Sequence, residues 1–262
     1  MGERHPGGFS TILAIGLNTF REAIRDRVLY LLLVFALIII GVSRLLSLLT
    51  VGDEEKIIKD VGLSAIAIFG VMTAVFVGVS LVFKEIERRT VYTLLAQPVQ
   101  RSEFLVGKFV GLFSVLLLNL LLMSGALFVL LAFRGESPWP LLPALLLIAV
   151  ELAVVTAFAL LFSSLTNPVL SSLWTFAVYV AGHLSWSLLM FREKLPEGAA
   201  RWICDGLYWL LPNFKRLDLK AQVVHGLPLP DGYVAFAAIY GLGYGVVIVA
   251  LACWAFSRKE FL

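Results

Sequence analysis

The chain has 262 residues, of which 60% are hydrophobic and only 15% are charged, and its mean hydropathy is +0.93. A water-soluble domain cannot bury so much apolar surface, so the composition excludes a soluble enzyme or binding module and indicates an integral membrane protein. The net charge of +3 gives no reason to expect a nucleic-acid partner. Two cysteines, Cys204 and Cys253, indicate neither a disulfide framework nor a cysteine-based metal site.

Residues 1–27 precede the first long apolar run and are predicted to contain an amphipathic helix. Its apolar and small residues share one helical arc: Phe9, Ile12, Leu13, Gly16, Leu17, Phe20, Ala23 and Ile24. The opposite arc carries Arg21 and Arg25. We expect this helix to lie in the cytoplasmic membrane interface. The alternative is a cytosolic extension of the first span.

Six apolar runs reach the length of about 20 residues that a spanning helix needs. They are residues 28–49, 62–83, 106–133, 141–162, 168–190 and 232–256. The third run is long enough to tilt or to extend beyond the bilayer. We therefore predict an all-α integral membrane protein in which residues 28–257 form a transmembrane domain of six helices.

The basic residues predict the orientation of the chain. Four arginines precede the first span, the loop at residues 50–61 is acidic, and the next loop is basic again. The positive-inside rule then places the N-terminus in the cytoplasm, together with the tail at residues 258–262. The loop at residues 191–231 disagrees, because six Lys and Arg residues lie on the predicted outside, but five acidic residues balance them.

The same outer loop is the only sizeable segment outside the predicted spans. Trp202, Tyr208 and Trp209 suit a segment at the level of the lipid headgroups. Pro212 interrupts it, and residues 217–224 have the composition of a short helix.

Residues 84–107 form a charged island between the second and third spans. The island pairs acids with bases, carries an apolar stripe at Val91, Leu94 and Leu95, and is broken by Pro98. This pattern predicts a short helix at the cytoplasmic membrane surface that offers a face to a soluble partner. Its charged residues can dock by charge, and its leucines can fill an apolar pocket. The alternative is a solvated loop whose charges pair with one another.

Three polar residues fall inside the predicted spans: Asn119, Glu151 and His183. Counted from the cytoplasmic ends, all three lie roughly 18–23 Å deep and can share one layer. An intramembrane carboxylate is energetically costly, so Glu151 is a candidate for a transport pathway, either paired with His183 or lining a polar path. The alternative is that the three residues only fix helix packing.

The chain lacks the common signatures of catalysis and nucleotide binding. No G-x-x-x-x-G-K-[ST] loop is present, because Lys108 is followed by Phe109, and no H-E-x-x-H motif occurs. We therefore expect no catalytic residues, no metal ligands and no cofactor in this chain.

The island resembles the cytoplasmic coupling region of ABC-2 type permeases, in particular the branch that includes the permease of the nitrous-oxide-reductase maturation system. The matching residues are Glu85, Glu87, Thr90, Leu94-Leu95, Pro98, Arg101 and Gly107-Lys108. Many relatives have glycine where this chain has Arg89. Further matching segments are Ser163-Ser164-Leu165-Thr166, Leu211-Pro212 and Phe256-Ser257-Arg258-Lys259-Glu260-Phe261.

The resemblance implies a non-catalytic, multi-pass subunit of the cell (inner) membrane that usually serves export. Its implied partners are two cytoplasmic ABC ATPases, which bind ATP and magnesium, and a second permease copy. An extracytoplasmic accessory protein is a further candidate. The residues assigned to contact with the ATPase are Glu85, Glu87, Arg88, Thr90, Leu94, Leu95, Pro98, Arg101 and Lys108.

Two other functions compete with the permease. One is a membrane scaffold that anchors an ATPase and transmits its motion without transport. The other is an intramembrane enzyme that uses Glu151 and His183.

Overall fold

The computed structural model describes residues 8–47, 53–87, 100–194 and 198–258, and these ranges contain helices but no strand. Its long helices are α2 (Arg27–Ser47), α3 (Glu54–Glu87), α5 (Arg101–Ala132), α6 (Leu142–Leu165), α7 (Pro168–Lys194) and α10 (Tyr233–Ser257). The short ones are α1 (Gly8–Ile24), η1 (Trp139–Leu141), α8 (Ala199–Leu210), η2 (Phe214–Arg216) and α9 (Lys220–Val224). The hydrocarbon core of a bilayer offers no hydrogen-bond partners to the backbone. A helix satisfies its backbone hydrogen bonds internally, so this all-helical architecture suits a bilayer.

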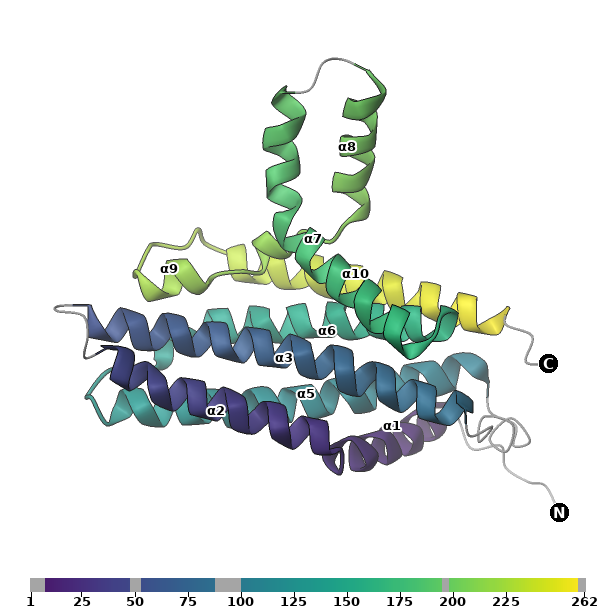
Figure 1. The fold of residues 1–262 in the computed structure, drawn as a ribbon, viewed down its shortest axis with the longest axis horizontal. Helices are drawn as coiled ribbons and strands as arrows, with labels where there is room; N and C mark the ends of the chain where they lie inside the picture. The colour runs from purple at the N-terminus through teal and green to yellow at the C-terminus, as the bar shows by residue number, and fades with distance from the viewer. Residues whose placement is uncertain (1–7, 48–52, 88–99, 195–197, 259–262) are drawn as a thin grey trace.

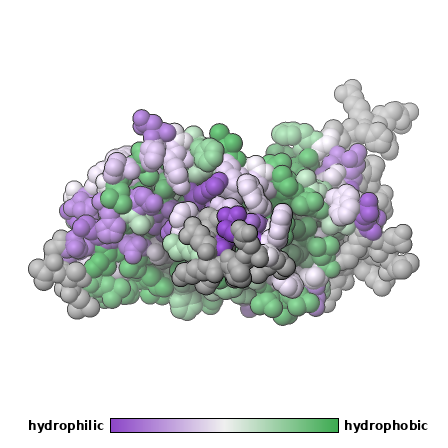
Figure 2. All heavy atoms as spheres, turned by 90° about the horizontal axis from the view of Figure 1, so that it is seen from above, coloured by the Kyte–Doolittle hydropathy of each residue, from purple (hydrophilic) through white to green (hydrophobic). Residues whose placement is uncertain are grey.

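The long helices lie side by side in one bundle with two distinct ends (Figure 1). We call one end the α1 end; it carries α1, the start of α5 and the last turns of α10. We call the other the α9 end; it carries α9 and the start of α3. In the view of Figure 2, hydrophilic residues gather over the α9 end, and hydrophobic residues cover much of the rest of that face.

Five helices in the described ranges are long and apolar enough to cross a membrane: α2, α3, α5, α6 and α10. They correspond to five of the six predicted runs, which confirms a helical multi-pass membrane protein. The remaining run, residues 168–190, lies in α7, which is not among the five. A count of six spans therefore stays a prediction.

Helix α6 forms the centre of the bundle. It is apolar on nearly every side, and residues on all of its faces are buried, among them Leu147, Ala157 and Leu160, each 0% exposed. Helices α3, α5, α7 and α10 all pack against it. A helix without a polar face suits either the interior of a bundle or contact with lipid, and α6 occupies the interior.

Helix α7 begins beside α6 and then leaves the bundle. Asn167 caps its first turn, because the Asn167 Oδ1 atom accepts a hydrogen bond from the Leu170 N–H at 2.9 Å, and Pro168 is its first residue. Farther along, α7 bends, and its second half forms an arm with α8 that projects from the side of the bundle (Figure 1). The Arg192 Nε atom lies 2.5 Å from Oδ1 of Asp205 and joins the two helices of this arm.

Helix α1 packs along the first turns of α5 through glycine contacts. A Cβ atom on Gly111 would lie 2.5 Å from the carbonyl oxygen of Gly16 and 2.6 Å from Cβ of Thr19. A Cβ atom on Gly107 would lie 2.8 Å from Cβ of Ile15. Gly107 and Gly111, spaced as G-x-x-x-G, thus let the two helix backbones approach closely.

Only part of the apolar arc predicted for residues 1–27 is buried in the contact with α5. Gly16, Thr19 and Ala23 are buried in it, whereas Phe9 and Leu13 are 80% and 51% exposed. The structure has a helix in this segment, α1, and its position in the membrane interface stays a prediction.

Much of the loop predicted at residues 191–231 is ordered structure. It contains the end of α7, then α8, η2 and α9, and α9 covers the second part of the helix expected at residues 217–224. Phe214, Leu217 and Leu219 are each 1% exposed and belong to the main hydrophobic core. The second half of this loop therefore folds back into the bundle instead of lying over it.

We predict that Gly111→Leu destabilises the protein by about 1–3 kcal/mol, because the added side chain overpacks the contact with α1. The melting temperature in detergent should fall by about 5 °C. Gly125→Leu is the matched control in the same helix, because a Cβ atom there meets nothing within 4 Å. Equal melting temperatures for the two variants would show that the α1–α5 contact does not need glycine.

Candidate transport and coupling sites

Glu151 of α6 and His183 of α7 meet inside the bundle. The His183 Nε2 atom lies 2.7 Å from Oε1 of Glu151, and the two side chains are 23% and 3% exposed. Glu151 stands near the middle of α6, among apolar residues. A buried carboxylate without a hydrogen-bond partner is strongly unfavourable, so His183 stabilises Glu151 and joins α7 to α6 at this level.

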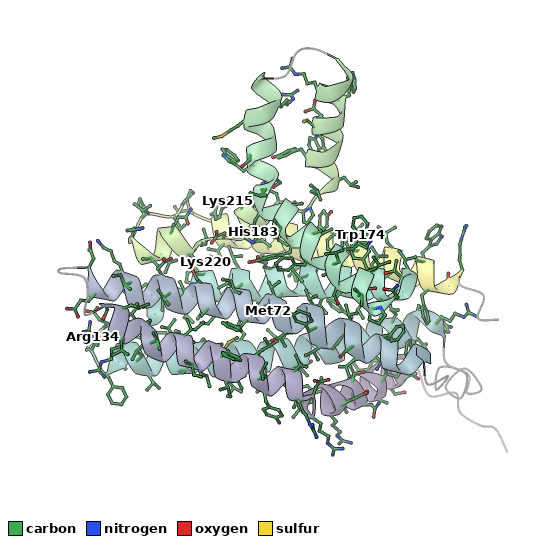
Figure 3. The ribbon with its side chains drawn as sticks, in the orientation of Figure 1. Met72, Arg134, Trp174, His183, Lys215 and Lys220 are labelled. Carbon is green, nitrogen blue, oxygen red and sulfur yellow. The ribbon has the colours of Figure 1, made fainter. Side chains whose placement is uncertain are left out.

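Aromatic rings surround the imidazole of His183. The Tyr179 ring meets it edge-on with centroids 4.7 Å apart, and the Phe214 ring lies 5.6 Å away. Gly182 makes room for Phe214, because a Cβ atom on Gly182 would lie 2.4 Å from that ring. Figure 3 shows His183 where α7 bends, beside the segment that carries Lys215 and Lys220. The ring of His183, a residue of α7, thus packs against Phe214 of η2.

Polar groups continue from this pair toward the α9 end. The Tyr179 hydroxyl lies within electrostatic reach of both Glu151 and Asp218. Asp218 in turn lies 3.8 Å from Nζ of Lys220. The described residues thus place Tyr179 near the Glu151–His183 pair and an Asp218–Lys220 pair at the start of α9.

Asn119, the third predicted intramembrane residue, has a different partner. Its Nδ2 atom donates to Oγ1 of Thr73 in α3 at 3.4 Å, and its Oδ1 atom has no hydrogen-bond partner among the described residues. Thr73 and Thr156 are among the residues that line a small pocket between α3, α5 and α6. The structure therefore brings Glu151 and His183 together and gives Asn119 a separate contact.

Most of the predicted coupling residues cannot be placed. Glu85 and Glu87 belong to the last turn of α3, although their side chains are outside the described part. Arg88, Thr90, Leu94, Leu95 and Pro98 lie outside the described residues altogether. The roles of all seven residues stay predictions.

Arg101 and Lys108, the last two predicted coupling residues, are placed in α5. The Nη1 atom of Arg101 donates to the carbonyl oxygen of Ser257 at 3.0 Å, which joins the start of α5 to the end of α10. Lys108 is only 1% exposed, and its Nζ atom lies 5.8 Å from the centroid of the Phe104 ring. The Lys108 side chain is thus buried in this structure instead of being offered to a partner.

Charged side chains join elements at the α9 end. The Arg134 Nη2 atom lies 2.5 Å from Oε2 of Glu54 and connects the turn after α5 to the start of α3. Lys56 lies 2.6 Å from Asp53, and this hydrogen bond and the lysine charge lower the pKa of the Asp53 carboxyl. These pairs are consistent with an α9 end that lies in water.

Sequence reasoning missed three tyrosines of α10. The Tyr244 hydroxyl donates to the carbonyl oxygen of Leu210 at 2.7 Å, and the Tyr233 hydroxyl donates to that of Arg216 at 3.1 Å. The Tyr240 hydroxyl accepts from the Asn213 N–H at 3.0 Å. The spacing of the tyrosines, seven and then four residues, was a usable signal, because it places three hydroxyls on one face of an otherwise apolar helix.

The cysteines and the candidate metal-ligating side chains of the described residues lie apart from one another. Cys204 and Cys253 are free thiols. The residues that the structure describes contain no group of three or more His, Cys, Asp or Glu side chains arranged to hold a metal ion.

Taken together, the fold defines a multi-pass helical membrane protein with a few buried polar contacts between its helices. A family model described as ABC-2 family transporter protein matches residues 13–261. The chain belongs to this family of membrane transport proteins, and the predicted ABC-2 permease is confirmed at that level. None of the curated proteins compared with the chain matches it.

We predict that Glu151 and His183 are energetically coupled. In a double-mutant cycle of Glu151→Leu and His183→Leu, the double variant should be about 1–3 kcal/mol more stable than the sum of the single effects predicts, because each single change strands one partner. The free energy of unfolding in detergent micelles measures this. The control cycle of Asn119→Leu and His183→Leu should be additive within about 0.5 kcal/mol. Additivity in both cycles would refute the coupling.

Proposed function

We propose that the chain is the transmembrane permease subunit of an ATP-binding cassette transporter. It couples ATP hydrolysis by a separate ATPase subunit to the movement of a substrate across the cell membrane, in the direction of export. The observation that carries this proposal is the family match over residues 13–261, on a bundle with five helices suited to cross a membrane.

The lengths of α3 and α5 support coupling at the α1 end. With 34 and 32 residues, they measure roughly 51 Å and 48 Å, whereas α2, with 21 residues, measures roughly 32 Å. A hydrocarbon core is about 30 Å thick, so α3 and α5 reach beyond it. The ends of these helices at the α1 end can then stand outside the membrane, where we propose that the Leu94 and Leu95 pair meets a soluble ATPase.

Contacts at the α1 end give a route for force from this connection into the bundle. The Arg101 guanidinium bonds the end of α10, and the rings of Phe104 and Phe256 stack with centroids 5.9 Å apart. Helix α1 is packed on α5 through Gly107 and Gly111. A push on the start of α5 therefore acts on α1 and α10 together, and α10 packs along α6, which carries Glu151.

The remaining parts of the proposal concern partners and location. Two cytoplasmic ATPases bind ATP and magnesium, and a second permease copy completes the translocation unit. Both termini face the cytoplasm, and the protein lies in the inner membrane. Its resemblance to the nitrous-oxide-reductase maturation branch makes an extracytoplasmic accessory protein a candidate partner at the α9 end. Glu85, Glu87, Arg88, Thr90 and Pro98 complete the proposed coupling surface.

We predict that the variant combining Leu94→Asp and Leu95→Asp releases the ATPase and leaves the chain inserted in the membrane, because two charges replace the apolar pair that fills the ATPase pocket. Co-purification from membranes measures this. Leu227→Asp is the control, because Leu227 is 54% exposed in the predicted outer loop. Retention of the ATPase by the paired variant at the control level would end the coupling role.

We also predict that Glu151→Gln lowers transport about tenfold, which corresponds to about 1.4 kcal/mol, because the carboxylate acts through its charge in the pathway. ATP hydrolysis by the complex should continue. Complementation of a strain that lacks the chain measures transport function, and Glu136→Gln, outside α6 and α7, is the control. Full complementation by Glu151→Gln would assign Glu151 to packing alone.

A further inference from the structure

The side chain of Asn119 places an unsatisfied oxygen inside the bundle. Asn119 is 3% exposed and belongs to α5, which packs against α3 and α6. Its Nδ2 atom donates to Oγ1 of Thr73 at 3.4 Å, whereas its Oδ1 atom has no hydrogen-bond partner among the described residues. Buried polar atoms in folded proteins nearly always have a partner, either in the protein or in an ordered water molecule. The Oδ1 atom of Asn119 therefore calls for a donor.

The orientation of the Asn119 amide follows from the hydrogen bond that Thr73 makes with its own helix. The Thr73 hydroxyl donates its proton to the carbonyl oxygen of Phe69 at 2.7 Å. The same oxygen can then only accept from Asn119, so the amide has to turn its NH₂ group toward Thr73. Exchanging the amide nitrogen and oxygen would bring two acceptors together. The unsatisfied atom is thus an acceptor.

The small pocket between α3, α5 and α6 begins beside this contact. Thr73 lines it from α3, and Val115 and Leu116 line it from α5. Asn119 follows Val115 and Leu116 by one turn on the same face of α5. The amide of Asn119 therefore lies at the edge of the pocket. The space inside is about that of one water molecule.

Thr156 brings a second acceptor to the pocket from α6. It lines the pocket and is 0% exposed. Its hydroxyl donates to the carbonyl oxygen of Leu152 at 2.7 Å, so its oxygen has lone pairs left but no proton. Oxygen acceptors from three different helices thus border the pocket, on Thr73, Asn119 and Thr156.

The chemistry of the pocket excludes most ligands. None of the described residues that line it is charged, so a metal ion or an ammonium group would be buried without a counter-charge, which is strongly unfavourable. The space is too small for an organic molecule. A water molecule is small and neutral, and it carries two protons for the acceptors at the border of the pocket.

From these observations we infer that the pocket is a binding site for one internal water molecule. The water donates to Oδ1 of Asn119 and to Oγ1 of Thr156, and Thr73 borders the same site. Buried waters usually make about three hydrogen bonds, a number that these three residues can supply. The water joins α6 to α3 and α5 in the interior of the bundle. This site does not depend on transport or on an ATPase, so failure of the proposed function would leave it intact.

A double-mutant cycle of Asn119→Leu and Thr156→Val in the full chain tests the water site. A water shared by both residues is released by either change, so the second change then costs little. The melting temperature of the double variant in detergent should be about 2–5 °C higher than the sum of the two single shifts predicts. Two residues without a shared water should be additive, because the Thr156 hydroxyl already bonds its own helix.

Thr175→Val is the matched control for Thr156→Val. Thr175 is 1% exposed, and its hydroxyl donates to the carbonyl oxygen of Ser171 at 2.7 Å within α7. The control therefore removes the same kind of buried hydroxyl at a position that does not line the pocket. In a cycle with Asn119→Leu, it should be additive within about 1 °C.

Two results of the cycles would overturn the water site. One is additivity of Asn119→Leu with Thr156→Val. The other is equal coupling in the Thr156 and Thr175 cycles, because the effect would then not belong to the pocket.

A second measurement uses the unchanged protein and serves if Asn119→Leu does not accumulate. In a density map that resolves ordered waters, we expect one peak within about 3 Å of Oδ1 of Asn119. A map with ordered waters elsewhere in the protein and no peak at this oxygen would overturn the inference.

Discussion

Helix α6 is apolar on nearly every side, and the other helices of the bundle bury most of its surface. Burying it requires α3, α5, α7 and α10 around it, which sets the order of the bundle. The same burial makes Glu151 exceptional, because its carboxylate must find its partner inside the protein. His183 supplies that partner at the bend of α7. This hydrogen bond between α6 and α7 therefore lies where the arm leaves the bundle and close to the buried residues 210–224.

The sequence predicted the parts of the fold that depend on hydropathy and length. The runs that became α2, α3, α5, α6 and α10 are long and uniformly apolar, and a bilayer leaves such runs no choice but a helix. Polar residues inside the runs were also conspicuous, so Glu151 and His183 could be named before their contact was known. The short helix near residues 217–224 was visible because Pro212 separates it from the preceding segment.

Other features could not be predicted, because they depend on which surfaces meet. Residues 210–224 fold back into the bundle by burying apolar side chains such as Leu217 and Leu219. Their apolar character is equally compatible with a position at the membrane surface. The small residues Gly107 and Gly111 permit a close contact, but they do not say that α1 is the helix that makes it. Lys108 has the charge of a surface residue, yet its side chain is buried in the fold. The reason is that α1 and α10 pack against α5.

The two ends of the bundle are held together by different kinds of contact. At the α1 end, long helices, a guanidinium bond to α10 and a glycine contact form a stiff unit next to the proposed ATPase site. At the α9 end, hydrogen bonds from tyrosine hydroxyls and aromatic stacking hold residues 210–224 against the bundle. Helix α6 joins the two ends, and Glu151 lies on it between them.

The central claim is that this chain works with a separate ATPase, and purification from the native membrane tests it most directly. The tagged chain would be extracted in mild detergent, and the proteins that accompany it would be identified and quantified by mass spectrometry. The account predicts an ATPase with a Walker motif in stoichiometric amount. A chain recovered alone, under conditions in which a control transporter keeps its ATPase, would contradict the account and leave Glu151 and His183 as residues of a stand-alone protein.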